Sequence, residues 1–208
     1  MEKFKKETDQ KSKRQELGLN ENDFVVGVVS RLEEGKGHQD ILRVIPQILE
    51  KKKNIKFLFI GDGPLRNELE SFAKNANINN HVIFTGLRLD VAEILKSIDI
   101  FCLASLYEGM GRVVLEAQAS GKPVIANRIG GIPNIVLDKK TAILVEPKND
   151  KSLSQALIRL MENESLRHAM GQEAAKFIDE RFSAKKMVDD INTLYENLLT
   201  DKKVRVNL

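Results

Sequence analysis

Short apolar runs alternate with amphipathic segments along the chain from residue 24 to residue 145. The runs are rich in β-branched and aromatic residues, and Gly, Ser, Asn or Pro follows each one within two residues. Short apolar runs bounded in this way are typical of buried strands. The pattern predicts six strands: Phe24–Val29, Phe57–Ile60, Val82–Phe84, Ile98–Leu103, Pro123–Ala126 and Ala142–Val145.

Apolar residues at helical spacing predict helices between these strands and after the last one. The first stripe covers residues 41–49 and contains Pro46, which predicts a kink or a later start of this helix. Pro64 is well placed at the first position of the next helix, and Asp90 can cap a short third one. The last two stripes cover residues 153–160 and 187–198.

Strands that alternate with helices predict βαβ crossovers and a parallel sheet. We therefore expect an α/β fold: a doubly wound, Rossmann-like sheet of about six strands with helices on both faces, followed by C-terminal helices. Residues 1–23 are interpreted as a linker or N-terminal extension, 24–199 as one domain, and 200–208 as a tail. Ligands of such folds bind at the carboxyl ends of the strands.

Composition narrows the class of protein. The chain has 208 residues, 42% hydrophobic and 30% charged, which is typical of a globular domain and not of a disordered chain. Its single cysteine, Cys102, excludes an internal disulfide framework and a cysteine-built zinc site. The sequence has no apolar run of about 18 residues and no signal-peptide core. We expect a cytoplasmic protein without a metal or cofactor.

The charge balance argues against nucleic acid as a partner. The 33 basic residues stand among 30 acidic ones, for a net charge of +3, and the chain has no Trp and two Tyr. Nucleic-acid-binding domains usually carry a clustered basic surface and aromatic platforms for the bases.

Two cations follow the first strand. Arg31 and Lys36 flank Gly35 in a loop that leads into a helix, and such a loop can wrap a diphosphate. Taken alone, the two side chains can equally be solvated loop cations. The Gly61-Asp62-Gly63-Pro64 turn after the second strand lets a ligand approach the backbone, but it is not the GxGxxG fingerprint of dinucleotide-binding proteins.

Two glutamates after the fourth strand are the strongest candidates for ligand contacts. Seven residues separate Glu108 from Glu116, and a helix that begins near Gly111 would present free amides to an anion. Eight helical residues rise about 12 Å, too far for both carboxylates to act on one glycosidic bond. They can instead hold hydroxyl groups at two ends of one ligand, such as a sugar and a ribose. The alternative makes Glu108 a helix cap and Glu116 a surface residue.

For three further features, a purely structural role is as well supported as a role in ligand binding, or better supported. Gly130-Gly131-Ile132-Pro133 forms either another turn with anion-binding amides or a plain turn. His38 lacks a second metal ligand nearby and is expected to pack at a helix start. Cys102 lies inside an apolar strand and is expected in the core.

The motifs together resemble a known family. They are Gly27-Val28-Val29-Ser30-Arg31-Leu32, Lys36-Gly37, Ile60-Gly61-Asp62-Gly63-Pro64, Glu108-x7-Glu116, Ala117-x-Ala119-x-Gly121-x-Pro123-Val124-Ile125-Ala126 and Gly130-Gly131-Ile132-Pro133. In this order and spacing, from about Phe24 to Leu199, they resemble the C-terminal domain of group 1 retaining glycosyltransferases with the two-domain GT-B fold. This sequence differs from the residue that the family often has at three positions: Met110 in place of Phe, Asn134 in place of Glu and Ala104 in place of Pro.

The resemblance implies a domain that binds a nucleotide-diphosphate-sugar donor for transfer of a hexosyl unit, without a metal. Arg31 and Lys36 would stabilise the departing diphosphate, Glu108 would contact the donor sugar and Glu116 the ribose. The remaining donor-binding positions implied are Gly61, Gly63, Thr85, Gly86, Leu87, Gly109, Met110, Gly111, Gly130 and Gly131, with Thr85–Leu87 beside the base.

The family also has an N-terminal domain, which binds a carbohydrate or lipid-linked acceptor. The resemblance implies that this domain is missing here and that the chain alone is inactive. Peripheral membrane contact through the missing domain remains open. Two alternatives also stay open: a non-catalytic nucleotide or nucleotide-sugar binding module, and a retaining phosphorylase-like enzyme that binds inorganic phosphate at Arg31 and Lys36.

Overall fold

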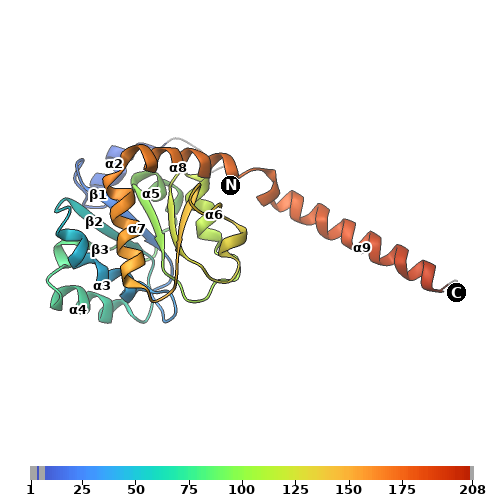
Figure 1. Ribbon diagram of the computed structural model, residues 1–208, viewed down its shortest axis with the longest axis horizontal. Coiled ribbons are helices and arrows are strands. Elements are labelled where there is room, and N and C mark those ends of the chain that lie inside the picture. Colours follow the sequence, from blue (N-terminus) through green and yellow to red (C-terminus); the bar gives the residue numbers. More distant parts are fainter. Residues whose placement is uncertain (1–3, 5–7, 207–208) are drawn as a thin grey trace. The chain divides into compact units, whose positions relative to one another are not determined.

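A six-stranded parallel sheet forms the centre of the chain, in a computed structural model that describes residue 4 and residues 8–206 (Figure 1). The strand order is β3-β2-β1-β4-β5-β6, which confirms the predicted doubly wound, Rossmann-like fold. The strands are β1 Phe24–Val29, β2 Ile55–Ile60, β3 Val82–Phe84, β4 Ile100–Leu103, β5 Val124–Asn127 and β6 Ala142–Val145. The sheet belongs to a compact unit, Met1–Phe177, and a second unit comprises Ile178–Leu208.

Helices cover both faces of the sheet (Figure 1). One face packs against α3 (His38–Leu49), α4 (Arg66–Asn75) and α7 (Asp150–Glu162). The other packs against α5 (Val91–Ser97) and α6 (Arg112–Ala119), with α2 (Gln10–Glu16) on α5 and α8 (Glu164–Phe177) on α6. Short 3₁₀ turns are η1 (Asn79–His81), η2 (Ile132–Asn134) and, in the second unit, η3 (Glu180–Phe182).

The alternation of side chains in the strands fills both layers of the core. Phe57 and Phe59 of β2 point to the α3 side and join the cluster that contains Ile41 and Ile45. Leu58, between them, is equally buried and lies outside that cluster. Burial on both faces explains why the strands appear in the sequence as continuous apolar runs.

Three of the six strand predictions have the observed bounds, and three differ by one or two residues. The fourth strand begins at Ile100 instead of Ile98, because pairing with β1 starts where Val26 meets Ile100. The second begins earlier, at Ile55, which pairs with Phe24. Strand ends are thus set by the neighbouring strand as well as by local hydrophobicity.

The helix start predicted at Pro64 is wrong and no later start occurs at Pro46, whereas the helix after Asp90 begins as predicted. α3 runs through Pro46 from His38 to Leu49. α4 begins at Arg66, because Pro64 lies in a turn that Arg66 closes by donating its backbone N–H to the Gly63 oxygen at 3.1 Å. Asp90 precedes α5, but its carboxylate caps no helical amide.

The polar segment before β1, expected as a linker or N-terminal extension, belongs to the first unit and contains a helix. Residues 10–16 form α2, and Leu17 and Leu19 after it are buried. Arg14 donates to the carbonyl oxygens of Ser97 and Asp23 and pairs with Asp99, so it ties α2 to the end of α5 and the start of β1. In the second unit, α9 (Ala184–Val206) continues through residue 199, where the sequence suggested that the domain gives way to a tail.

The loops that leave β1, β4 and β5 pack backbone against backbone. A Cβ atom on Gly37 would lie 1.9 Å from the Ala104 carbonyl oxygen, and Gly37 has φ +69°, a conformation that favours glycine. A Cβ on Gly131 would lie 2.0 Å from the carbonyl oxygen of Gly109. Only glycine therefore fits at these crossings, and the three loops hold one another in place.

Replacing Gly131 with Ala is expected to lower the free energy of unfolding by about 1–3 kcal/mol, because the new methyl group forces the two backbones apart. The matched control is Gly109→Ala, since a Cβ there has nothing within 4 Å. The control should leave stability unchanged or raise it slightly, through a less flexible unfolded chain. Urea unfolding followed by circular dichroism measures both variants, and equal stabilities would contradict the close backbone contact.

A network of charges joins α2 to the segment before α5. The Asp90 carboxylate accepts hydrogen bonds from Arg88 Nε at 2.7 Å and from Lys13 Nζ at 2.7 Å. Glu16 and Glu93 complete the network through Lys13, at 2.7 and 2.9 Å. The guanidinium of Arg88 and the ammonium of Lys13 lower the pKa of Asp90 well below its usual range. Asp90 therefore stays ionised in the folded protein at pH values where an unfolded aspartate becomes protonated.

Because folding depresses the pKa of Asp90, its contribution to stability is present above the unfolded value, about 3.9, and is lost as the pH falls. Asp90→Asn is expected to lower the free energy of unfolding by roughly 0.5–1 kcal/mol at pH 7, the scale of partly exposed ion pairs. The difference from the wild type should shrink toward pH 3. Urea unfolding at several pH values measures this, with Glu162→Gln on α7 as the control. A difference that does not change with pH would be contrary to this assignment.

Candidate functional site

Strand order reverses between β1 and β4, so the loops after these two strands diverge and leave space at the carboxyl edge of the sheet. We call this edge the rim. It consists of residues 30–37, 61–63, 85–87, 104–111 and 127–131, which follow β1 to β5. Every site residue predicted from the sequence lies in the rim, except Glu116, which lies on α6.

Lys36 and Glu108 form an ion pair across the point of reversal. Lys36 Nζ lies 2.9 Å from Glu108 Oε1, and Ser105 Oγ donates to the same oxygen at 2.9 Å. The side chains of Lys36 and Glu108 are 23% and 16% exposed, so the pair is sheltered but open to a ligand. It borders a cavity of about 430 Å³ lined by Lys36, Leu106, Tyr107, Glu108, Gly109 and Gly130.

Arg31 lies on the same loop as Lys36 but is far more accessible. Its side chain is 74% exposed, and Nη1 lies 3.3 Å from Glu33 Oε2. The loop itself is fixed to the next one, because Leu106 donates its backbone N–H to the Gly35 oxygen at 2.7 Å. Both cations thus lie on a fixed backbone. The Lys36 side chain is held by Glu108, whereas the Arg31 side chain extends into solvent.

His38 fastens the far end of this loop. Its ring is 2% exposed, and Nε2 lies 2.8 Å from Ser30 Oγ, so the residues on either side of the 31–37 segment are joined. Burial, and then the charge of Lys36, lower the pKa of His38 to about 4. The imidazole is therefore neutral at physiological pH and takes the packing position at the helix start that the sequence suggested.

The helix after the fourth strand begins where the sequence predicted. Gly111 is the N-cap of α6, with φ +69°, and a Cβ there would lie 2.4 Å from Ile132 Cδ1. The first turn of any helix leaves amide N–H groups without helical partners, and the helix dipole makes that end positive. Glu116, one turn along α6, is 19% exposed and lies 3.9 Å from Arg112 Nη2 through Oε1.

The turns after β2 and β3 continue the rim away from this cavity. Gly61 donates its backbone N–H to the Gly86 oxygen at 3.0 Å, and Gly61 also packs against the Ser30 carbonyl. Thr85 Oγ1 donates to the Gly86 oxygen at 3.0 Å, whereas Leu87 is 79% exposed. Gly63 packs against the Leu32 carbonyl and so joins the turn after β2 to the loop after β1.

Four of the predicted site residues, Lys36, Glu108, Gly109 and Gly130, line one cavity. Gly131 packs behind Gly109, and Met110 is exposed beside it. The positions after β2 and β3 lie on the other part of the rim, and no described cavity contains both groups. What each residue does toward a ligand stays a prediction.

Sequence analysis missed three polar residues that shape the site. Ser105 holds the Glu108 carboxylate, and Asn127 at the end of β5 donates from Nδ2 to the Ala104 and Ser105 oxygens at 2.8 and 3.0 Å. Arg112 is the third, beside Glu116. A polar side chain at the end of an apolar strand was the available signal for Asn127. Arg112 lies inside the Glu108-x7-Glu116 motif and Ser105 lies three residues before it, and no pattern in the sequence marks either one.

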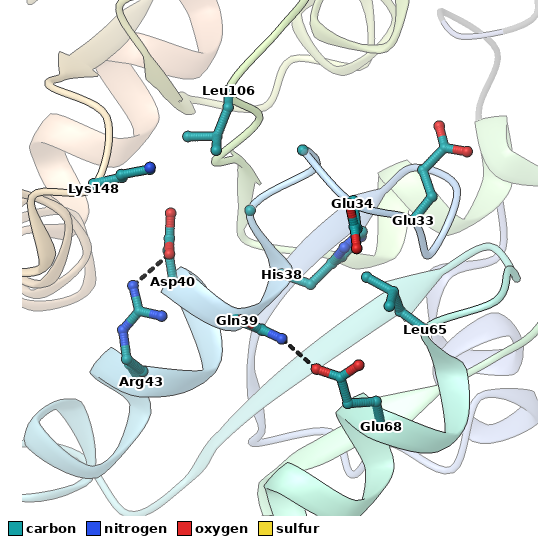
Figure 2. Close-up of a pocket in the computed structure, with 12 residues that line it drawn as sticks. Glu33, Glu34, His38, Gln39, Asp40, Arg43, Leu65, Glu68, Leu106 and Lys148 are labelled. Atoms are coloured by element: carbon teal, nitrogen blue, oxygen red, sulfur yellow. Dashed lines mark hydrogen bonds and ion pairs between the residues drawn. The ribbon is translucent and has the colours of Figure 1, made fainter.

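A second cavity of about 450 Å³ adjoins the first (Figure 2). Leu106 lines both cavities. Lys36 lines the first cavity, and its neighbours Gly35 and Gly37 line the second. Figure 2 shows two pairs among the polar side chains of the second cavity, Gln39 with Glu68 and Arg43 with Asp40. It contains none of the site residues predicted from the sequence.

The part of the chain that the structure describes also bears on metal ligands, the cysteine thiol and membrane-spanning helices. Among these residues, no group of three or more His, Cys, Asp or Glu is arranged to hold a metal ion. Burial raises the pKa of the Cys102 thiol to about 12, so this thiol stays protonated in the core. No described helix combines the length and the apolar character needed to cross a membrane.

Comparison with known proteins identifies the family. The family described as "Glycosyl transferases group 1" matches residues 9–177. The chain is 32% identical over 200 residues to the N-acetyl-alpha-D-glucosaminyl L-malate synthase of Bacillus anthracis, covering 96% of this chain and 52% of that protein. It is also 32% identical to an Escherichia coli UDP-Gal:alpha-D-GlcNAc-diphosphoundecaprenol alpha-1,3-galactosyltransferase, covering 89% of this chain and 49% of that one. The chain thus spans about half the length of these relatives.

Solved structures agree. Anabaena Alr3699/HepE in complex with UDP and glucose is 26% identical with a TM-score of 0.86, and the match covers 94% of this chain and 54% of that one. The C-terminal domain of LpcC, a group 1 glycosyl transferase family protein from Francisella tularensis, is 25% identical with a TM-score of 0.79, covering 88% of this chain and 97% of that domain. The resemblance suggested by the motifs is therefore confirmed: the chain belongs to the group 1 glycosyltransferases.

Proposed function

We propose that this chain binds a nucleotide-diphosphate-sugar and stabilises the diphosphate as the glycosyl unit leaves with retention of configuration. The observation that carries the proposal is the sheltered pair of Lys36 and Glu108 in the cavity beside the start of α6. A cation and a carboxylate meet there, and the amino end of a helix follows three residues after Glu108. These groups suit a ligand with both phosphate and hydroxyl groups.

The roles in the proposal follow from charge and position. Lys36 and Arg31 face the phosphate oxygens, where negative charge grows as the bond between sugar and phosphate breaks. Glu108 accepts hydrogen bonds from sugar hydroxyls, and Glu116 accepts them from the ribose. The positive charge toward the diphosphate comes from the chain's own side chains, so the proposal needs no divalent metal.

The names of the relatives indicate which nucleotide the donor is expected to carry. Alr3699/HepE was crystallised with UDP and glucose, and the galactosyltransferase of Escherichia coli carries UDP-Gal in its name. UDP is therefore the first nucleotide to test. We place the carbohydrate or lipid-linked acceptor, and any peripheral contact with a membrane, in the half of the relatives that this chain does not match. A cytoplasmic location is part of the same proposal.

The ribose role of Glu116 makes a direct prediction. Glu116→Ala should weaken UDP binding by about 1–3 kcal/mol, the scale of hydrogen bonds to a charged group, as measured by isothermal titration calorimetry. Glu162→Ala removes an exposed carboxylate of α7 and serves as the matched control. If Glu116→Ala keeps both the fold and the affinity of the wild type, Glu116 does not hold the ribose.

Residues 1–208 alone are expected to bind UDP and yet transfer sugar at a negligible rate, because no acceptor is positioned and water is not excluded from the open cavity. UDP release from UDP-glucose, UDP-galactose and UDP-N-acetylglucosamine measures this, with candidate acceptor sugars present and absent. Lys36→Met in parallel identifies any release that does not come from this site. Rapid acceptor-dependent turnover that Lys36→Met abolishes would show that the chain is catalytically sufficient.

A further inference from the structure

Arg112 follows the proposed donor site closely in the sequence, three residues after Gly109, which lines its cavity. It is the first residue of α6, directly after the Gly111 cap that packing against Ile132 fixes in place. Its side chain is 83% exposed, in contrast to the 19% exposed side chain of Glu116 on the next turn. The backbone of Arg112 is thus fixed, whereas its guanidinium is free to reorient.

The contact between Arg112 and Glu116 is loose. The 3.9 Å between Arg112 Nη2 and Glu116 Oε1 is within ion-pair range but longer than a hydrogen bond. An exposed pair of this kind, four residues apart on a helix, contributes about 0.3–0.5 kcal/mol. A ligand that offers Arg112 a better partner can therefore displace Glu116 from it with little loss.

In the structure the Arg112 guanidinium is turned along α6 toward Glu116. Side chains on an α-helix tilt toward its amino end, so a long side chain on the first residue can extend past the helix start once it leaves such a partner. Residues four apart lie on the same face of a helix, so Arg112 shares a face with Glu116 while it belongs to the first turn, which carries the free amides. A planar guanidinium matches paired phosphate oxygens and is suited to a diphosphate.

We propose that Arg112 is a third cation for the donor's diphosphate, and that donor binding transfers it from Glu116 to the phosphate oxygens. This inference rests on the proposed function, because it takes Glu116 as the ribose contact. The transfer joins two events: the phosphates gain a cation, and Glu116 gives up a partner as the ribose hydroxyls arrive.

A double-mutant cycle with UDP tests the inference. Arg112→Leu should weaken UDP binding about tenfold, the loss expected for a charge-assisted hydrogen bond. It should also make affinity less dependent on salt, because one cation fewer acts on the phosphates. The decisive comparison repeats Arg112→Leu in the Glu116→Ala background, with affinities measured by titration calorimetry or, for weak complexes, by NMR.

The cycle separates a direct role from an indirect one. If Arg112 binds the diphosphate, its loss weakens UDP binding with Glu116 present or absent. If Arg112 only orients Glu116, the effect disappears in the Glu116→Ala background, and the inference is overturned. Arg159→Leu, an exposed arginine of α7, is the matched control and should leave affinity unchanged. Circular dichroism confirms the fold of each variant.

The same experiment separates this inference from the function on which it rests. A wild-type chain that binds none of UDP, GDP and ADP at millimolar concentration overturns the proposed function and the role of Arg112 together. A wild-type chain that binds UDP, with Arg112→Leu binding it equally well at low salt, overturns the role of Arg112 alone. Arg112→Lys should give an intermediate affinity, because it keeps the charge and loses the planar pair of donors.

Discussion

Backbone packing between the loops that leave β1, β4 and β5 is the constraint on which the candidate site depends. Gly37 lies against the Ala104 carbonyl, and Gly131 lies against that of Gly109, at separations no side chain can occupy. Asn127, the last residue of β5, donates hydrogen bonds from its side chain to the Ala104 and Ser105 carbonyl oxygens of the loop after β4. Because main-chain contacts set the distance between the loops, Lys36 and Glu108 meet as a consequence of the fold.

The charges of the site satisfy one another before any ligand arrives. Arg31 pairs with Glu33, Lys36 with Glu108, and Arg112 with Glu116. A ligand must therefore exchange partners instead of meeting bare charges. Under the proposed function, a nucleotide-diphosphate-sugar suits this exchange, since phosphates replace the carboxylates around the cations and hydroxyl groups satisfy the released carboxylates. Of the three cations, Lys36 is the most sheltered, so its exchange takes place with the least screening by water.

The sequence allowed the sheet to be predicted because buried parallel strands show as apolar runs, and it allowed the loop motifs to be located because they directly follow those runs. Its failures come from contacts between distant segments. Asp90 looks like a helix cap but is held by Lys13, and α2 carries too few apolar residues to reveal that Arg14 ties it to the core. Ser105 went unnoticed for the same reason, since its role depends on a carboxylate that the loop turns back toward it.

The rim is open, and this bears on how strongly its charges can act. Leu87, Tyr107 and Met110 expose apolar surface along it, and Arg31 is largely in solvent, where Coulomb interactions are weakest. Under the proposed function, a body that covered this edge would bury those side chains, exclude water and strengthen every contact to the diphosphate without any change in the site itself. The relatives are about twice as long as this chain, so they have room for such a cover. Under the same proposal, affinity measured on this chain reports the rim alone, and rate enhancement belongs to the covered state.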